Sequence, residues 1–202
     1  VGASISVRLV QANVPQNLKF EPNGIARAFD DHWALMQGQG QEKAADLVAL
    51  PESIFPAPLQ HVPPAYVQAF RDFAQKHQTA VIYGIFLEEP RGKFFNSAVG
   101  YAPGDPGLRR YSKRHLVPFG EFIPPGFRWF VDLMKMPIGD QQRGATAQPL
   151  SLAGQQIAVN ICYEDLFGAE IIEAWHTQGP EPTLMLNISN LAWFNDSLAL
   201  PQ

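Results

Sequence analysis

Three polar side chains follow apolar stretches of the chain and differ in the chemistry that they can do. Glu52 comes after "LVALP", Lys113 after the strand-like "LRRYS", and Cys162, the single cysteine, after "IAVNI". A carboxylate can take the proton of a thiol, and the thiolate can attack a carbonyl or nitrile carbon. An ammonium group can then stabilise the negative oxygen that forms. If the fold brings the three together, they make a coherent site for covalent catalysis.

Each of these residues also has an ordinary structural explanation. A single cysteine at the end of a strand is more often a small buried apolar residue than a nucleophile. A glutamate after a strand is commonly a loop or cap residue, and a lysine close to Arg109, Arg110 and Arg114 is commonly a solvated charge. Composition and spacing alone therefore leave the function undecided.

The elements that must position these residues alternate between short β-branched runs and longer segments with helical spacing. Helices are predicted in segments 24–40, 64–78 and 167–178, and strands in 5–14, 45–53, 79–89, 94–104, 108–118 and 183–190. Segment 148–165 is predicted to be a hairpin around "AG", and "APGDPG" is predicted to be the turn between the fourth and fifth of those strands. The pattern indicates an α/β protein with a mixed sheet.

Length and composition indicate one domain. The chain has 202 residues, of which 46% are hydrophobic, and a net charge of −4 without long runs of like charge, so it has no nucleic-acid footprint. A single cysteine cannot form an internal disulfide, and the longest uncharged run, 144–163, contains too many polar residues to cross a membrane. Because the chain begins at Val1 and stops at "ALPQ", we expect residues 1–202 to be one domain cut from a longer protein.

Three phrases carry a family resemblance when they are taken together. "LPES", "YSKRHLVPFGEFIP" and "NICYEDLFG", in this order, resemble the carbon-nitrogen hydrolase (nitrilase) superfamily, whose members use a Glu-Lys-Cys triad in the same chain order. The resemblance implies that Glu52 is the general base, Lys113 the oxyanion-stabilising lysine and Cys162 the nucleophile.

The same phrases imply three supporting residues. Glu121 matches the second glutamate that follows the lysine in "PFGE", and Tyr163 and Glu164 match the residues after the nucleophile. The backbone amide of Tyr163 is expected to help bind the oxyanion. The resemblance implies no metal or organic cofactor.

Within the superfamily, "KRHLVPFGEFIP", "ICYEDLFG" and "NISNLAWFNDS" are most similar to the periplasmic domain of the apolipoprotein N-acyltransferase family. This similarity implies a nitrilase-type four-layer αββα sandwich, incomplete at its C-terminal end, that belongs to a longer protein of the bacterial inner membrane and faces the periplasm. The expected reaction moves an acyl chain from a phospholipid, through a cysteine thioester, to the amine of a diacylglyceryl-cysteine lipoprotein. The expected partners are therefore the phospholipid donor, the apolipoprotein acceptor and, through flanking helices, the membrane.

The loop after the last strand departs from the family pattern. Leu191 and Asn195 stand where the family commonly has an aspartate and a glycine, so only a positioning role is expected for this loop. Trp193 is expected to line the site, and a place in the core is an equally good explanation for it.

Segment 122–138 is rich in large apolar residues and has two interpretations. One is a helix packed in the core, which "FRWFVDLM" alone favours slightly. The other is a lid that dips into the lipid interface, with Trp129 and Phe130 at headgroup depth and basic groups near phosphates.

Two rival functions stay open from the sequence. A soluble amidase or nitrilase would use the same triad and differ in the bond attacked and in whether water resolves the intermediate. A binding domain without activity would keep the fold, but the presence of all three triad residue types speaks against it.

Overall fold

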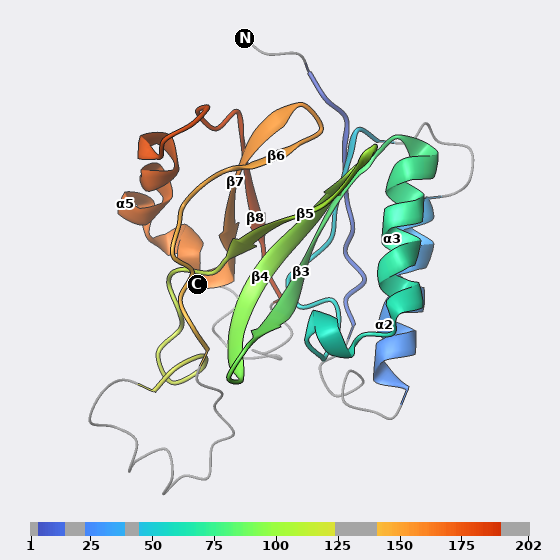
Figure 1. Cartoon of the computed structure of the whole chain (residues 1–202), viewed down its shortest axis with the longest axis horizontal. Helices are drawn as coiled ribbons and strands as arrows, with labels where there is room; N and C mark the ends of the chain where they lie inside the picture. The colour runs from blue at the N-terminus through green and yellow to red at the C-terminus, as the bar shows by residue number, and fades with distance from the viewer. Residues whose placement is uncertain (1–3, 15–22, 39–44, 124–140, 191–202) are drawn as a thin grey trace, which may run out of the picture.

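The computed structural model of the chain describes residues 4–14, 23–38, 45–123 and 141–190 (Figure 1). Its elements up to Ser112 are β1 (Val7–Leu9), α2 (Gly24–Gln37), β2 (Leu47–Ala49), the 3-10 turn η1 (Leu59–His61), α3 (Pro64–His77), β3 (Ala80–Glu89), β4 (Lys93–Ala102) and β5 (Asp105–Ser112). They are followed by β6 (Leu150–Leu152), β7 (Gln155–Ile161), η2 (Cys162–Leu166), α5 (Gly168–Ile171), η3 (Ile172–His176) and β8 (Leu184–Ile188). The predicted alternation of helices and strands is confirmed.

The larger sheet has five strands in the order β1-β2-β3-β4-β5. β1, β2 and β3 are parallel, because a helix or a long connection returns the chain to the same end before each new strand. β3, β4 and β5 are antiparallel neighbours joined by short turns. The mixed sheet that the sequence predicts is therefore present, and its parallel half carries β2, the strand that leads to Glu52.

The smaller sheet has the order β6-β7-β8 and packs face to face with the larger one. Ile82 of β3 and Ile157 and Val159 of β7 belong to the apolar cluster between the two sheets. On the far side of the larger sheet, α2 and α3 form one outer layer, and α5 with η3 lies outside the smaller sheet (Figure 1). These four layers make the αββα sandwich expected from the family resemblance.

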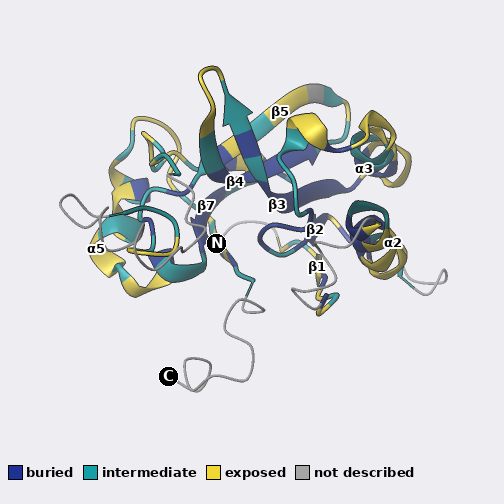
Figure 2. Cartoon of the chain, turned by 90° about the horizontal axis from the view of Figure 1, so that it is seen from below, coloured by how far each residue is buried: buried dark blue, intermediate teal, exposed yellow. Residues whose placement is uncertain are grey.

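The outer helices bury one face each against the larger sheet (Figure 2). Phe29 of α2 stacks on Tyr66 of α3 with ring centroids 4.2 Å apart, and Phe70 of α3 lies 4.9 Å from the ring of Tyr83 in β3. The opposite faces are exposed, as the helical spacing of the sequence predicts. This aromatic layer packs against one face of the larger sheet, and Glu52 lies past the end of one of its strands.

Two local predictions differ from the structure. The helix predicted at 167–178 is a four-residue α-helix, α5, that continues as the 3-10 turn η3. Helix periodicity alone missed this, because His115 and Arg114 hold Glu170 and Glu173 of this segment through tertiary contacts. The turn before β5 is also shorter than predicted, since β5 already begins at Asp105 after an irregular pairing in β4.

The predicted hairpin around "AG" is confirmed. Ala153 and Gly154 form its two-residue turn with φ values of 51° and 70°, the left-handed backbone that tight hairpin turns require.

In the ranges described, we find no helix with the length and apolar character needed to cross a membrane.

Candidate active site

Glu52 and Lys113, two of the predicted site residues, come together at the ends of their strands. Glu52 follows β2 and Lys113 follows β5, and the Lys113 Nζ lies 4.0 Å from Oε1 of Glu52. Both side chains are almost completely buried, with 5% and 1% of their surface exposed. A buried carboxylate and ammonium need each other and further hydrogen bonds to offset the loss of water.

A glycine of β3 fixes where Glu52 sits. Gly84 donates its N–H to the carbonyl of Pro51 and accepts the N–H of Ile54, both at 3.0 Å. A Cβ atom on Gly84 would lie only 2.4 Å from the Cα of Glu52. The backbone of Glu52 can therefore press against β3 only because residue 84 has no side chain.

Glu121 contacts Lys113 more closely than Glu52 does. The Lys113 Nζ donates to Oε1 of Glu121 at 2.9 Å, and the other oxygen of Glu121 accepts the backbone N–H of Val117 at 2.9 Å. The backbone N–H of Glu121 in turn donates to the carbonyl of Val117. Glu121 thus holds the lysine from a loop that closes on itself.

Asn96 belongs to the same cluster, although it was not among the predicted site residues. Its Nδ2 donates to Oε1 of Glu52 at 2.7 Å and to Oε1 of Glu121 at 3.1 Å. A polar residue within the apolar strand "FFNSAVGY" was the available signal, but only the register of the sheet shows that it faces the site.

Cys162 stands directly after β7 in an unusual backbone conformation. Its φ is 53°, in the left-handed region that side chains other than glycine rarely adopt. Such backbone strain often occurs where function requires it. The amide of Asn187 in the neighbouring strand β8 donates to the Cys162 carbonyl at 3.3 Å and helps to keep the turn in place.

The surroundings of Cys162 disfavour its charged form when no substrate is bound. Burial and the nearby carboxylate of Glu52 raise the pKa of the half-buried thiol to about 11. The Lys113 charge and the backbone N–H of Tyr163 act in the opposite direction. The pKa of Glu52 is itself raised by burial, against the effects of Lys113 and Asn96. Glu52, Lys113 and the backbone N–H of Tyr163 therefore all act electrostatically on the Cys162 thiol.

Glu164 has a different environment from the other two glutamates. Its Oε1 accepts the backbone N–H groups of Arg114 and His115 at 2.6 and 3.0 Å, and its Oε2 accepts the N–H of Ile161 at 2.7 Å. The hydroxyl of Tyr111 lies 3.0 Å from both oxygens. Glu164 therefore ties the residues after Lys113 to the residue before Cys162.

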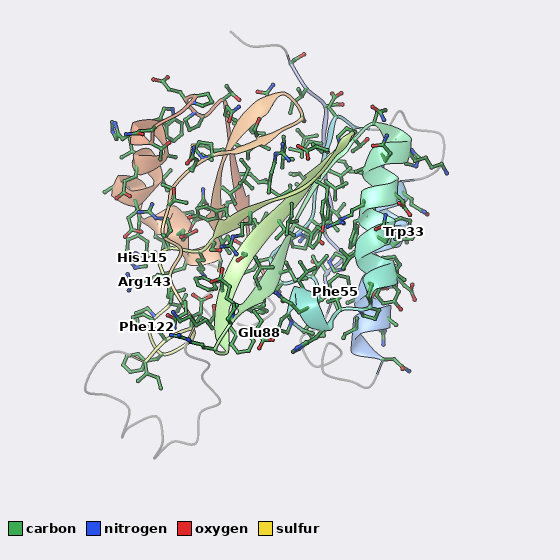
Figure 3. All side chains as sticks on the ribbon, viewed as in Figure 1. Trp33, Phe55, Glu88, His115, Phe122 and Arg143 are labelled. Carbon is green, nitrogen blue, oxygen red and sulfur yellow. The ribbon has the colours of Figure 1, made fainter. Side chains whose placement is uncertain are left out.

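An aromatic stack covers this junction. His115 stacks on Phe167 with centroids 3.6 Å apart, and its Nδ1 lies 2.7 Å from Oε1 of Glu170. The ring of Tyr163 packs edge-on against Phe167. Figure 3 shows His115, like Phe122 and Arg143, on the side of the molecule away from α2 and α3.

Three predicted lipid-contacting residues lie outside the described residues: Trp129, Phe130 and Trp193. Of segment 122–138, the structure describes only Phe122 and Ile123. The guanidinium of Arg143 lies 5.4 Å from the ring centroid of Phe122.

Within the described ranges, no three His, Cys, Asp or Glu side chains are grouped so that they could hold a metal ion.

The comparison with protein families gives one decisive match. The model of the carbon-nitrogen hydrolase family matches residues 6–202. The chain belongs to the carbon-nitrogen hydrolase family. Two curated relatives are the apolipoprotein N-acyltransferases of Ralstonia nicotianae, 45% identical over the whole chain, and of Bordetella bronchiseptica, 40% identical over the whole chain. This carbon-nitrogen hydrolase chain covers 38% and 40% of the length of those two relatives.

Solved structures support the carbon-nitrogen hydrolase fold. A CN-hydrolase superfamily protein from Xanthomonas campestris superposes with a TM-score of 0.63 at 21% identity, over 94% of this chain and 66% of that protein. A nitrilase superfamily member from Saccharomyces cerevisiae gives a TM-score of 0.60 at 20% identity, over 92% of this chain and 64% of that protein. The family and the αββα fold expected from the sequence are thus confirmed.

Proposed function

We propose that this chain is the catalytic domain of an N-acyltransferase that acts on bacterial lipoproteins. The observation that carries the proposal is the buried charge cluster of Glu52 and Lys113, which acts electrostatically on a cysteine held in a left-handed turn. The choice of acyl transfer over hydrolysis rests on the named relatives, because they are apolipoprotein N-acyltransferases that align with the whole of this chain.

In the first half-reaction, Cys162 attacks the ester carbonyl of a phospholipid acyl chain. Glu52 takes the thiol proton as the carbon–sulfur bond forms, so that the thiolate need not exist beforehand. The Lys113 ammonium and the Tyr163 N–H stabilise the negative oxygen. The carbon–oxygen bond then breaks, the proton on Glu52 passes to the departing lysophospholipid alcohol, and a thioester remains on Cys162.

In the second half-reaction, the α-amine of a diacylglyceryl-cysteine lipoprotein attacks the thioester carbonyl. Glu52 takes a proton from the amine, the carbon–sulfur bond breaks, and the proton returns to the sulfur of Cys162. Glu121 holds Lys113 in place through both steps, since its carboxylate lies 2.9 Å from the ammonium. All chemistry is carried by side chains of this domain and by the backbone amide of Tyr163.

The substrates also define where the domain works. A phospholipid donor and a lipid-anchored acceptor both reside in a membrane, so residues 1–202 would be one part of a longer inner-membrane protein and would face the periplasm. This chain covers 38% and 40% of the length of the two named relatives, which supports its placement as one part of a longer protein. Segment 122–138 stays a prediction for the lipid-facing lid.

The test uses the full-length protein, a phospholipid with a labelled acyl chain and a lipopeptide with a free α-amine. We expect the label to appear on the protein as a thioester that hydroxylamine removes, and to move to the lipopeptide when it is added. Cys162→Ala should abolish both products. Label released only as free fatty acid, or hydrolysis of simple amides faster than acyl transfer, would favour the amidase instead.

A further inference from the structure

Asn96 of β4 contacts three of the polar residues at the site. Its side-chain Nδ2 donates to Glu52 and to Glu121, and its backbone carbonyl accepts the N–H of Lys113 at 2.8 Å. The side chain is 1% exposed, so water does not compete for these hydrogen bonds. Both amide hydrogens of Asn96 are used on carboxylates.

The donors nearest to the two carboxylates differ: the closest side-chain donor to Glu121 is the Lys113 cation, and the closest donors to Glu52 are neutral. Lys113 lies 2.9 Å from Glu121 and 4.0 Å from Glu52, so its ion pair is mainly with Glu121. The two oxygens of Glu52 instead accept neutral donors, Nδ2 of Asn96 and the backbone N–H of Asn190 at 2.9 Å. Asn96 is therefore the closest side-chain donor to Glu52, as Lys113 is to Glu121.

The orientation of the amide has a cost that folding alone does not explain. The Oδ1 of Asn96 is buried and accepts no hydrogen bond from the residues that the structure describes. Turning the amide over would place that oxygen against two carboxylates, which is repulsive. A buried acceptor without a donor destabilises a protein, so this arrangement favours the geometry of the site over stability.

We propose that Asn96 is a positioning residue that orients Glu52 as the base for Cys162 and keeps the Lys113 ammonium with Glu121. The inference rests on the proposed function, in which Glu52 takes protons. Without Asn96, Glu52 would lose a fixed donor and be free to turn toward Lys113. A closer ion pair between those two than the present 4.0 Å would leave the carboxylate of Glu52 badly placed for the thiol.

The variants for the test are Asn96→Ala, which removes the donors, and Asn96→Ser, whose single hydroxyl hydrogen can serve one carboxylate at a time. The matched control is Ser97→Ala on the next residue of β4. Ser97 is also fully buried, and its hydroxyl pairs with that of Ser112 at 2.9 Å, whereas no side-chain hydrogen bond joins it to Glu52, Lys113, Glu121 or Cys162 among the described residues. The control therefore removes a buried hydrogen bond from the same strand without touching the site.

The first readout is the rate of thioester formation as a function of pH, measured on the full-length protein. Asn96→Ala should lower the rate at neutral pH about 10²-fold, the effect of a misplaced base. Loss of a hydrogen bond to the ionised form should raise the pKa of Glu52, so the acid limb of the profile should move up by about one pH unit. The charged or titratable groups that influence the pKa of Glu52 or are coupled to it are Lys113, Glu121 and Cys162. Asn96→Ser should give an intermediate shift.

The second readout separates this inference from the proposed function. Acylation of Cys162 by a p-nitrophenyl ester, recorded beside thermal melting, does not require a phospholipid. If the wild type reacts with the activated ester only, the phospholipid proposal fails and the Asn96 variants still report on Glu52. An unshifted acid limb in Asn96→Ala and Asn96→Ser, or the same rate loss in Ser97→Ala at equal stability, would overturn the positioning role.

Discussion

Two buried glutamates, Glu52 and Glu164, flank the proposed nucleophile Cys162, and they are held in opposite ways. Glu164 accepts three backbone N–H groups and the hydroxyl of Tyr111, so both of its oxygens are saturated with donors. Glu52 accepts one side-chain amide and one backbone N–H, and its nearest cation is 4.0 Å away. The fixed donors on both oxygens of Glu164 suit it to anchoring the chain, whereas Glu52, with few donors and a pKa raised by burial, is suited to taking up a proton.

The strongest test of this contrast is Glu52→Gln. The amide keeps the shape of the side chain but cannot take a proton, so thioester formation should fall about 10²- to 10⁴-fold, the usual contribution of a general base. Thermal melting should change little in comparison. Rapid quenching with labelled donor measures the rate, and a loss below tenfold would show that Glu52 is not the base.

The pH dependence of thiol alkylation tests the same region without a substrate. Because the pKa of Cys162 is raised to about 11, the rate of reaction with iodoacetamide should rise about tenfold per pH unit from pH 7 to 10. In Glu52→Gln a negative charge near the sulfur is gone, so the pKa should fall and the curve should shift to lower pH. A plateau already reached near pH 8 in the wild type would contradict the raised pKa.

Glu164→Gln should affect stability more than chemistry. The new amide nitrogen would face N–H groups that now donate to an oxygen, so at least one donor would lose its partner and the charge-assisted bonds would weaken. We expect the free energy of unfolding to fall by about 3 kcal/mol. Urea denaturation measures this change, and Glu164→Asp, which keeps the charge on a shorter side chain, is the control.

Tyr111→Phe should have the smallest effect. Burial and the charge of Glu164 raise the pKa of the Tyr111 hydroxyl, which therefore stays protonated and able to donate. Its removal leaves Glu164 with its backbone donors, so we expect a loss of about 1 kcal/mol in unfolding free energy. An effect as large as that of Glu164→Gln would mean that the hydroxyl, and not the backbone, holds this carboxylate.

The sequence predicted the strands that lead into the site better than it predicted the site's internal contacts. Apolar periodicity located β2 and β7, and the strand predicted at 108–118 is instead β5 at Asp105–Ser112, which ends before Lys113. The family phrases indicated Glu52, Lys113 and Cys162, which follow these three strands. The break of the helix predicted at 167–178 into α5 and η3 was not predicted. Arg114 and His115 make long-range contacts with Glu173 and Glu170 there, and these contacts outweigh the local helical pattern.

Asn96 and Gly84 show why the remaining contacts could not be read in advance. Each stands inside an apolar strand, and its importance depends on which residue of a distant segment lies opposite. For Gly84 that neighbour is the backbone of Glu52, and for Asn96 it is a pair of carboxylates 44 and 25 residues away along the chain. Such pairings follow from the packing of sheet and loop, which local propensity does not encode.

The hydrogen bond from the Asn190 N–H to Glu52 joins residues 138 positions apart in the sequence. This is the longer separation of the two hydrogen bonds described for Glu52. Synthesis proceeds from the N-terminus, so Glu52 leaves the ribosome long before Asn190 does. Closing so long a loop is slow and becomes favourable only after the sheets have assembled. Glu52 therefore acquires its final hydrogen bonds late, after the segment that contains Cys162 has already been synthesised.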